Sequence, residues 1–290
     1  MSDLLQYIIT GVTIGAIYAL VALGFHIIFK ATEIFNFAQG TFVVFGGLLA
    51  YSLVVNAKIH FAIALVLVAA IGLVAGRLLE IIIRKPLLTG AHLIIIIATI
   101  AIGIILENAY LLIWSKEYMP FPPFTAGDPV PFLGAIVPRQ SLWVIGLTVA
   151  VLVLIKLFFK CTLSGRAMEA AANNPMAARS VGINVELMII YSLAMSTALA
   201  FVGGMMIAPI TFAGGPAGPG LTVKGFVAGI LGGIEDSNAV ILGGLLFGLM
   251  ESVVGGMISS GLKEAITFSL LLIIFGFRPT GLFVRSKEGH

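Results

Sequence analysis

Nine mostly apolar stretches follow one another along the chain, separated by short polar breaks. Runs such as Leu93-Ile-Ile-Ile-Ile97 do not alternate between apolar and polar residues, so they do not fit the strands of a membrane barrel. The pattern predicts helices near 5–29, 35–56, 61–83, 92–114, 141–159, 187–209, 223–234, 239–258 and 262–277. The stretch 223–234 is short against the ~20 residues of a full crossing, which makes it a candidate re-entrant or half helix.

Composition places these helices in a membrane. The chain is 60% hydrophobic and 10% charged, with a mean hydropathy of +1.14, whereas a soluble domain carries about 25% charged residues. We therefore expect an all-α, polytopic transmembrane bundle of about eight or nine spans, forming one domain over residues 1–290. The N-terminus has no basic segment before its first apolar stretch, so no cleavable signal peptide is expected.

The basic residues orient the bundle, because cytoplasmic loops carry an excess of lysine and arginine. Most of them fall on one side if the N-terminus is outside and the C-terminus is cytoplasmic, and the opposite side then holds Lys58, Lys116 and Arg139. The residues on the inner side are Lys30, Arg84, Lys85, Lys160, Arg166, Arg179, Arg278, Arg285 and Lys287. Only 16 basic residues are spread over the whole chain, so the pI near 9.0 indicates topology and not nucleic-acid binding.

The segment 161–186 is the long polar interruption on this inner side. Its alanine-rich part, 166–173, favours a helix. Asn174-Pro175 restarts the chain, with asparagine as N-cap and proline at the first helical position. Gly182 then supplies a left-handed C-cap. The sequence thus predicts two short helices outside the bilayer, where another protein can dock.

Two outer segments are rich in turn formers. Ser115–Gln140 contains six prolines and several aromatic residues, which suggests a loop folded on the membrane face, and 214–220 is a glycine–proline turn. Each is either a connector or a partner contact. The small-residue pairs Gly11/Gly15, Gly72/Gly76, Gly229/Gly233 and Gly244/Gly248 predict close helix packing.

Signatures of catalysis and of metal binding are missing from the sequence. The dipeptide Gly-Lys never occurs, so the chain has no phosphate-binding loop for ATP, and it has no HExxH, CxxC or GxSxG pattern. A single cysteine, Cys161, excludes an internal disulfide framework. We expect a transport protein that is not an enzyme, and that holds neither a metal nor a cofactor.

Ionisable residues inside membrane helices are the usual functional flags, since each costs roughly 2.5–3.5 kcal/mol at a helix centre. Glu251 lies deep in its helix and is a candidate for facing a cavity. Arg77 and Glu80, three residues apart, favour a self-neutralising pair at the inner interface. Glu107 and Asn108 face either a cavity or the outer interface, and Glu235-Asp236 is most simply a loop.

A polar cluster stands at the start of the second apolar stretch. Asn36 and Gln39 share a helix face, and Gly40 beside them allows a close backbone approach. Buried amides of this kind either lock neighbouring helices together or line a pathway for a polar solute, and both interpretations stay open. A helix N-terminus at this point also suits a carboxylate.

Four motifs, in order and with fitting spacing, resemble the branched-chain amino acid ABC permeases of the LivH/LivM type, and the LivH half more than LivM. The first is Asn36-Phe-Ala-Gln-Gly40, and the second combines Gly165-Arg-Ala, Ala170-Ala-Ala-Asn173 and Gly182-Ile-Asn184. The others are Lys224-Gly-Phe-Val-Ala-Gly-Ile-Leu-Gly-Gly-Ile234 and Arg278-Pro-Thr-Gly-Leu-Phe283. Gln39 stands where the family often has histidine, which together with the proline-rich loop allows a related solute such as urea, a short amide or an aromatic acid.

The resemblance implies an inner-membrane permease subunit that works with a second, LivM-like permease. Two cytoplasmic ATPases that use ATP and magnesium would drive the pair, and an extracytoplasmic binding protein would deliver the solute. Segment 161–186 would couple to the ATPase through Arg166, Glu169, Ala170, Asn173 and Gly182. Asn36, Gln39, Gly40 and Glu251 are the residues expected along the solute pathway. The alternatives are a sugar-type ABC permease and a stand-alone secondary carrier or channel.

Overall fold

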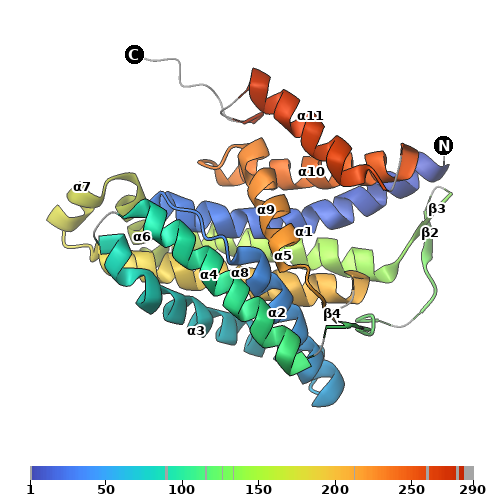
Figure 1. Cartoon of the computed structure of the whole chain (residues 1–290), viewed down its shortest axis with the longest axis horizontal. Coiled ribbons are helices and arrows are strands. Elements are labelled where there is room, and N and C mark those ends of the chain that lie inside the picture. Colours follow the sequence, from blue (N-terminus) through green and yellow to red (C-terminus); the bar gives the residue numbers. More distant parts are fainter. Residues whose placement is uncertain are drawn as a thin grey trace. The chain divides into compact units, whose positions relative to one another are not determined.

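The nine predicted helices are all present in the computed structural model (Figure 1), which describes residues 2–88, 91–114, 116–125, 127–132, 134–211, 213–258, 261–278 and 281–283. They are α1 (Ser2–Thr32), α2 (Gln39–Tyr51) with the π-helical turn η1 (Ser52–Asn56), α3 (Phe61–Leu88), α4 (His92–Trp114), α5 (Arg139–Cys161), α8 (Val185–Thr211), α9 (Gly218–Gly232), α10 (Ser237–Met257) and α11 (Lys263–Phe277). The predicted short pair follows α5 as α6 (Leu163–Asn173) and α7 (Pro175–Ser180).

Seven of the described helices are long and apolar enough to cross a membrane, and the chain is a multi-pass membrane protein. The other two apolar helices, α9 and α11, have 15 residues each. The shortness of α9 was predicted, although the helix begins at Gly218 and not near residue 223. Whether α9 is re-entrant stays a prediction.

The chain divides into two compact units. Unit 1 consists of 1–26, 123–148 and 224–290, and unit 2 of 27–122 and 149–223. The single domain predicted over residues 1–290 stays a prediction. Arg285 and Lys287 of the predicted inner side, Pro279-Thr280 of the C-terminal motif and Ser115 of the outer loop lie outside the described residues.

In unit 2, α8 packs against α2 and α3 where glycines remove side chains from the contact. A Cβ added at Gly72 would lie 2.7 Å from the Cα of Ala198, and one added at Gly76 would lie 2.5 Å from the Cα of Ala194. The Gly72/Gly76 pair predicted for close packing therefore marks the α3–α8 contact.

In unit 1, α1 and α10 approach one another in the same way. A Cβ at Gly11 would lie 2.8 Å from the Cα of Leu249, and one at Gly15 would lie 2.8 Å from the Cα of Leu245. Gly244 and Gly248 meet Ala19 and Gly15 from the α10 side. Two predicted glycine pairs thus face each other across one helix contact.

The two segments predicted to lie outside form short strands that the sequence did not predict. β1 (Tyr118–Met119) pairs antiparallel with β4 (Ala213–Gly214), and β2 (Val130–Phe132) forms a hairpin with β3 (Ala135–Val137). The strands are only two or three residues long, too short for an alternating pattern to be recognised. Gly214 and Gly215 have φ of +99° and +68°, which explains the glycines of this turn.

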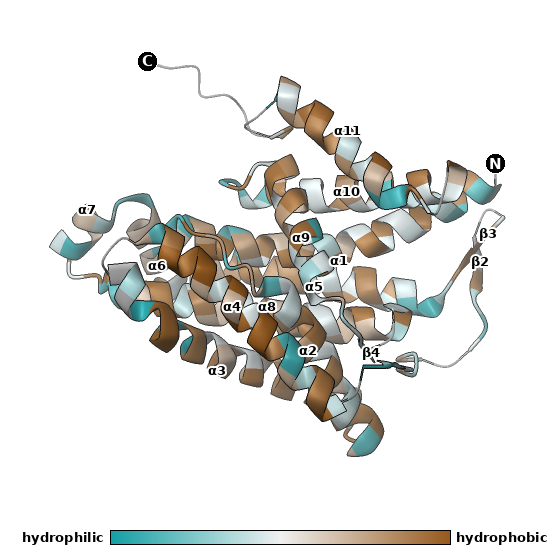
Figure 2. Ribbon diagram, viewed as in Figure 1, coloured by the Kyte–Doolittle hydropathy of each residue, from teal (hydrophilic) through white to brown (hydrophobic). Residues whose placement is uncertain are grey.

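Large apolar side chains stay exposed along α3, α4 and α5, as expected for helices that face lipid. Figure 2 shows these helices as mainly brown, whereas α7 carries teal, hydrophilic residues. Within unit 2, α6 and α7 lie at one end and β4 lies at the other, with α8 connecting the two ends (Figure 1). The polar helix pair and the β1–β4 strands are therefore on opposite sides of unit 2.

Candidate functional site

The junction between α1 and α2 is a tight, hydrogen-bonded turn in unit 2. Glu33 has a φ of +56°, and the Asn36 side-chain oxygen accepts a hydrogen bond from the Ala38 N–H at 3.1 Å. Phe37 N–H donates to Thr99 Oγ1 of α4 at 3.2 Å. The turn ends the first helix and sets the start of α2 at Gln39.

Gln39 and Gly40 tie this start to neighbouring helices. Gln39 is fully buried, its Nε2 donates to the Ser196 carbonyl of α8 at 3.2 Å, and its Oε1 accepts from the Ser196 hydroxyl at 3.2 Å. The Gly40 N–H donates to Thr222 Oγ1 of α9 at 2.9 Å. The structure thus shows these residues locking helices together, and their lining of a solute pathway stays a prediction.

Asn36 differs from Gln39 because half of its amide is unsatisfied. The residue is 2% exposed and its Nδ2 has no hydrogen-bond partner. It borders a cavity of about 10 Å³ with Thr32 and Thr99, a volume comparable to a single water.

Segment 161–186 has the predicted caps. The Asn174 side chain accepts from the Ala177 N–H at 2.9 Å at the start of α7, and Gly182 has a φ of +86° after its end. One cap was missed: Thr162 Oγ1 accepts from the Gly165 N–H at 2.9 Å, which starts α6 at Leu163 and not at Arg166. Threonine three residues before this N–H is the signal that identifies it.

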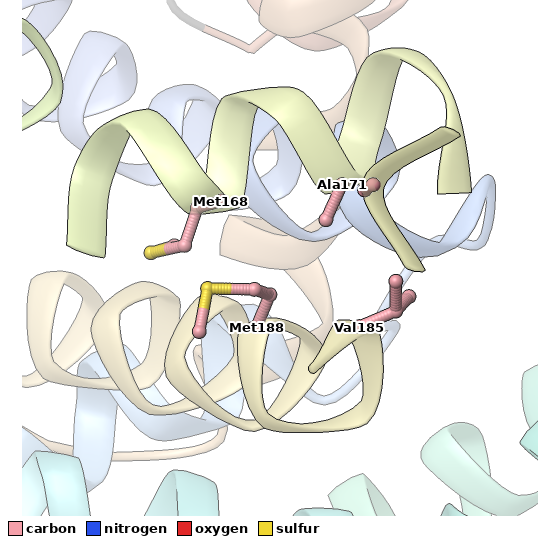
Figure 3. Packing of buried hydrophobic residues seen from close by; sticks show 5 residues of the cluster. Met168, Ala171, Val185 and Met188 are labelled. Atoms are coloured by element: carbon pink, nitrogen blue, oxygen red, sulfur yellow. The ribbon is translucent and has the colours of Figure 1, made fainter. Parts of the chain in front are cut away.

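One side of the α6–α7 pair packs against the first turns of α8. Met168 and Ala171 of α6 face Val185 and Met188 of α8, and Ala178 of α7 completes the cluster (Figure 3). All five are at most 7% exposed. The pair is therefore fixed to a membrane-crossing helix, and a displacement of α6 and α7 bears directly on α8.

The side of the α6–α7 pair that faces away from α8 is exposed and partly apolar. Leu163, Met176 and Val181 are 85%, 81% and 76% exposed. All five predicted coupling residues are exposed too: Arg166, Glu169, Ala170, Asn173 and Gly182. Glu169 also pairs with Lys30 at 3.4 Å. We call the surface formed by these eight residues the α6–α7 face, and its contact with an ATPase stays a prediction.

Basic residues assigned to the inner side gather near this end of unit 2. Arg84 pairs at 3.2 Å with Glu186, which lies in the first turn of α8 two residues before Met188. Arg84 also approaches Glu80 at 3.7 Å, and Glu80 pairs with Arg77 as the sequence predicted.

On α4, Asn108 donates to the Ile104 carbonyl of its own helix at 2.8 Å, and Glu107 is half-buried.

Glu251 lies in unit 1, at the centre of a buried ionic cluster. Its carboxylate accepts from Lys224 of α9 at 2.8 Å, from Lys263 of α11 at 2.9 Å and from the Tyr18 hydroxyl of α1 at 2.6 Å. Lys224 also pairs with Glu264 at 2.9 Å. Four helices are thus joined at one side chain that is 3% exposed, and a pathway role for Glu251 stays a prediction.

These partners of Glu251 were missed by sequence reasoning because they lie 12 or more positions away on other helices. The carboxylate in an apolar helix was the signal that a basic partner must exist.

Asp236, assigned to a loop, caps α10 by accepting from the Asn238 and Ala239 N–H groups. No cluster of three or more histidine, cysteine, aspartate or glutamate side chains suited to a metal occurs among the described residues.

Fold and surfaces together define the class: a multi-pass helical membrane protein with an ordered polar helix pair at one end of a compact unit. Residues 7–275 match the family model for the branched-chain amino acid transport system / permease component. The chain therefore belongs to this family of permease components.

Curated relatives cover nearly the whole chain. The high-affinity branched-chain amino acid transport system permease protein BraD of Pseudomonas aeruginosa is 27% identical over 98% of this chain and 96% of its own. The corresponding LivH protein of Escherichia coli K12 is 26% identical over 98% and 96%. A probable branched-chain amino acid transport permease protein LivH of Methanocaldococcus jannaschii is 28% identical over 81% and 76%.

Proposed function

We propose that this chain is the permease subunit of an ATP-driven importer and forms half of the translocation pathway for branched-chain amino acids or a related small polar solute. The family match supports transport, and the relatives are named for branched-chain amino acid systems. The chain has no phosphate-binding loop of its own, so in this proposal a partner subunit binds and hydrolyses the ATP.

The proposed assembly contains a second, LivM-like permease, two cytoplasmic ATPases that bind ATP and magnesium, and an extracytoplasmic solute-binding protein. The chain lies in the cytoplasmic membrane with its N-terminus outside. Lys30, Arg84 and Arg179 at the α6–α7 end of unit 2 support this orientation, because cytoplasmic ends are enriched in basic residues.

The α6–α7 face is the observation that carries the proposal. Its exposed Leu163 and Met176 stand on helices whose other side is already packed against α8, and the exposed Val181 follows directly after α7. Exposed apolar groups outside the bilayer and rimmed by polar residues are typical of protein interfaces. An ATPase bound there would displace α8 through the Met168–Met188 contact when it closes on ATP, and differential affinity for the two states of the permease would provide the drive.

The test is co-purification in mild detergent from membranes that hold the whole system, with a tag after His290. Native protein should retain the second permease and the ATPase. Met176→Glu puts a charge at an 81% exposed position and should release the ATPase while the second permease stays bound. Ile136→Glu is the matched control: it is 61% exposed in the β3 strand and should retain both partners.

A native chain that purifies without any ATPase contradicts the importer proposal. Retention of the ATPase by both Met176→Glu and Leu163→Glu contradicts the α6–α7 face as its docking site.

A further inference from the structure

A cavity of about 270 Å³ lies within unit 2, between α2 and α8. Its walls come from Val43, Val44 and Gly47 of α2 and from Gly204, Ile207 and Ala208 of α8. The first of these residues stands one helical turn after Gln39 on α2, so the cavity lies further along the helix that begins at the polar cluster.

The two helices beside the cavity approach one another closely at two glycines. A Cβ added at Gly47 would lie 3.1 Å from the Gly204 carbonyl oxygen, and Gly204 itself stacks on the backbone of Val43. The two backbones are therefore already in contact at these glycines. Ligand sites in proteins are typically concave and mostly apolar with a few polar groups, and this partly open cavity has that form.

Polarity divides the cavity into an apolar interior and a polar mouth. Val44 and Ala208 inside are at most 5% exposed, and the lining contains no charged side chain. Thr211 and Tyr118, at the β1–β4 end, are exposed. Burial of an unpaired ammonium or carboxylate in such an interior is too costly, so an occupant must keep its charges at the mouth and place an apolar group inside.

The volume also selects the size of the occupant. An apolar cavity of about 150 Å³ is large enough to bind benzene, so a cavity of about 270 Å³ has room for a small aliphatic group. The four-carbon side chain of leucine is smaller than benzene and therefore fits, with room at the mouth for the α-amino and carboxylate groups. Its β1–β4 end is the end of unit 2 opposite α6 and α7, the side from which a solute enters in the proposed importer.

We propose that this cavity is the subsite that receives the branched aliphatic side chain of the solute during translocation, with Val44 and Ala208 as the residues that set the accepted size. This inference rests on the proposed function and makes it more specific. It assigns the permease itself a share of the selectivity, in addition to any selection by an extracytoplasmic binding protein.

The test compares ATP-dependent uptake of leucine and valine, which differ by one methylene, in vesicles that contain the whole importer. Ala208→Val narrows the cavity and should lower the leucine-to-valine uptake ratio by about tenfold, the lower end of the discrimination that one methylene gives in an apolar pocket. Val44→Ala widens it and should raise the ratio or admit phenylalanine. The same binding protein serves every variant, so its own selectivity cancels when each ratio is compared with the native ratio.

Ala200→Val is the matched control, because Ala200 is fully buried on α8 but does not line the cavity. It should leave the ratio unchanged even if total uptake falls. Val44→Ala removes atoms and so keeps the test valid if Ala208→Val does not fold. If Ala208→Val and Val44→Ala both keep the native leucine-to-valine uptake ratio, the subsite proposal is wrong. If the native importer shows no ATP-dependent uptake, the proposed function itself is wrong.

Discussion

Gln39 and Ser196 exchange two hydrogen bonds, each 3.2 Å long, across the contact between α2 and α8. Both ends of the buried amide are satisfied by one residue of the neighbouring helix. An amide paired in this way holds α2 at a defined height along α8.

Replacement of this amide should weaken the contact. Gln39→Leu leaves the buried Ser196 hydroxyl without this acceptor and should lower the free energy of unfolding by about 1–3 kcal/mol, measured by thermal unfolding in detergent. Ser196→Ala added to Gln39→Leu should cost little more, because the shared interaction is already lost. If the double variant lost as much unfolding free energy as Gln39→Leu and Ser196→Ala lose separately in sum, the Gln39–Ser196 pairing would be contradicted. A loss of uptake beyond the loss of folded protein would assign Gln39 to the solute pathway.

Gly76 should tolerate no side chain. A Cβ there would lie 2.5 Å from the Cα of Ala194, so Gly76→Ala should push α3 from α8 and destabilise the protein by about 1–3 kcal/mol. Gly146→Ala in α5 is the control, since a Cβ there meets nothing within 4 Å. Its melting temperature should be unchanged or higher, because alanine favours a helix more than glycine does. Equal effects of the two changes would show that packing is not the cause.

Loss of Glu251 should be more damaging than loss of its partner Lys263. Glu251→Leu leaves Lys263 and the Tyr18 hydroxyl without this carboxylate and Lys224 with Glu264 alone, and should destabilise the protein by about 3 kcal/mol. Lys263→Met should cost less, because Lys263 is one-third exposed and Lys224 still neutralises Glu251. Thermal unfolding of the two variants gives the comparison, and a Lys263→Met variant less stable than Glu251→Leu would contradict the arrangement.

Gly182 should require a residue that adopts a left-handed conformation. Its φ is +86° and a Cβ would meet nothing within 4 Å, so backbone strain alone decides the effect of a substitution. Gly182→Val should distort the end of α7 and uncouple ATP hydrolysis from uptake, whereas Gly182→Asn should keep both, because asparagine tolerates this region. Uptake and ATPase activity measured in the same vesicles distinguish the two. Native uptake by Gly182→Val would refute the coupling role.

Asn174 should matter as the cap of α7. Asn174→Ala removes the acceptor for the Ala177 N–H and should destabilise this helix by about 1 kcal/mol. Asn174→Asp, which keeps the acceptor, is the control. Hydrogen exchange of the α7 amides should be faster only in the alanine variant.

Much of this molecule was determined by local sequence. The nine apolar stretches became nine helices because lipid leaves the backbone no other way to satisfy its hydrogen bonds. Asn174, Pro175 and Gly182 placed the boundaries of α7, because a cap acts within its own turn. The glycine pairs on α1 and α3 were recognised as packing sites from their spacing alone, although their partners were not.

Only the tertiary structure decided which residues meet. Three features depend on helices that are far apart in sequence. Gln39 hydrogen-bonds to Ser196, and Glu251 pairs with Lys224 and Lys263. Val44 and Ala208 line one cavity from two different helices. A helical pattern reports which face is apolar, but lipid and protein are equally apolar neighbours. For this reason the partners across a membrane helix contact follow from side-chain shape and paired polar groups, which hydropathy does not encode.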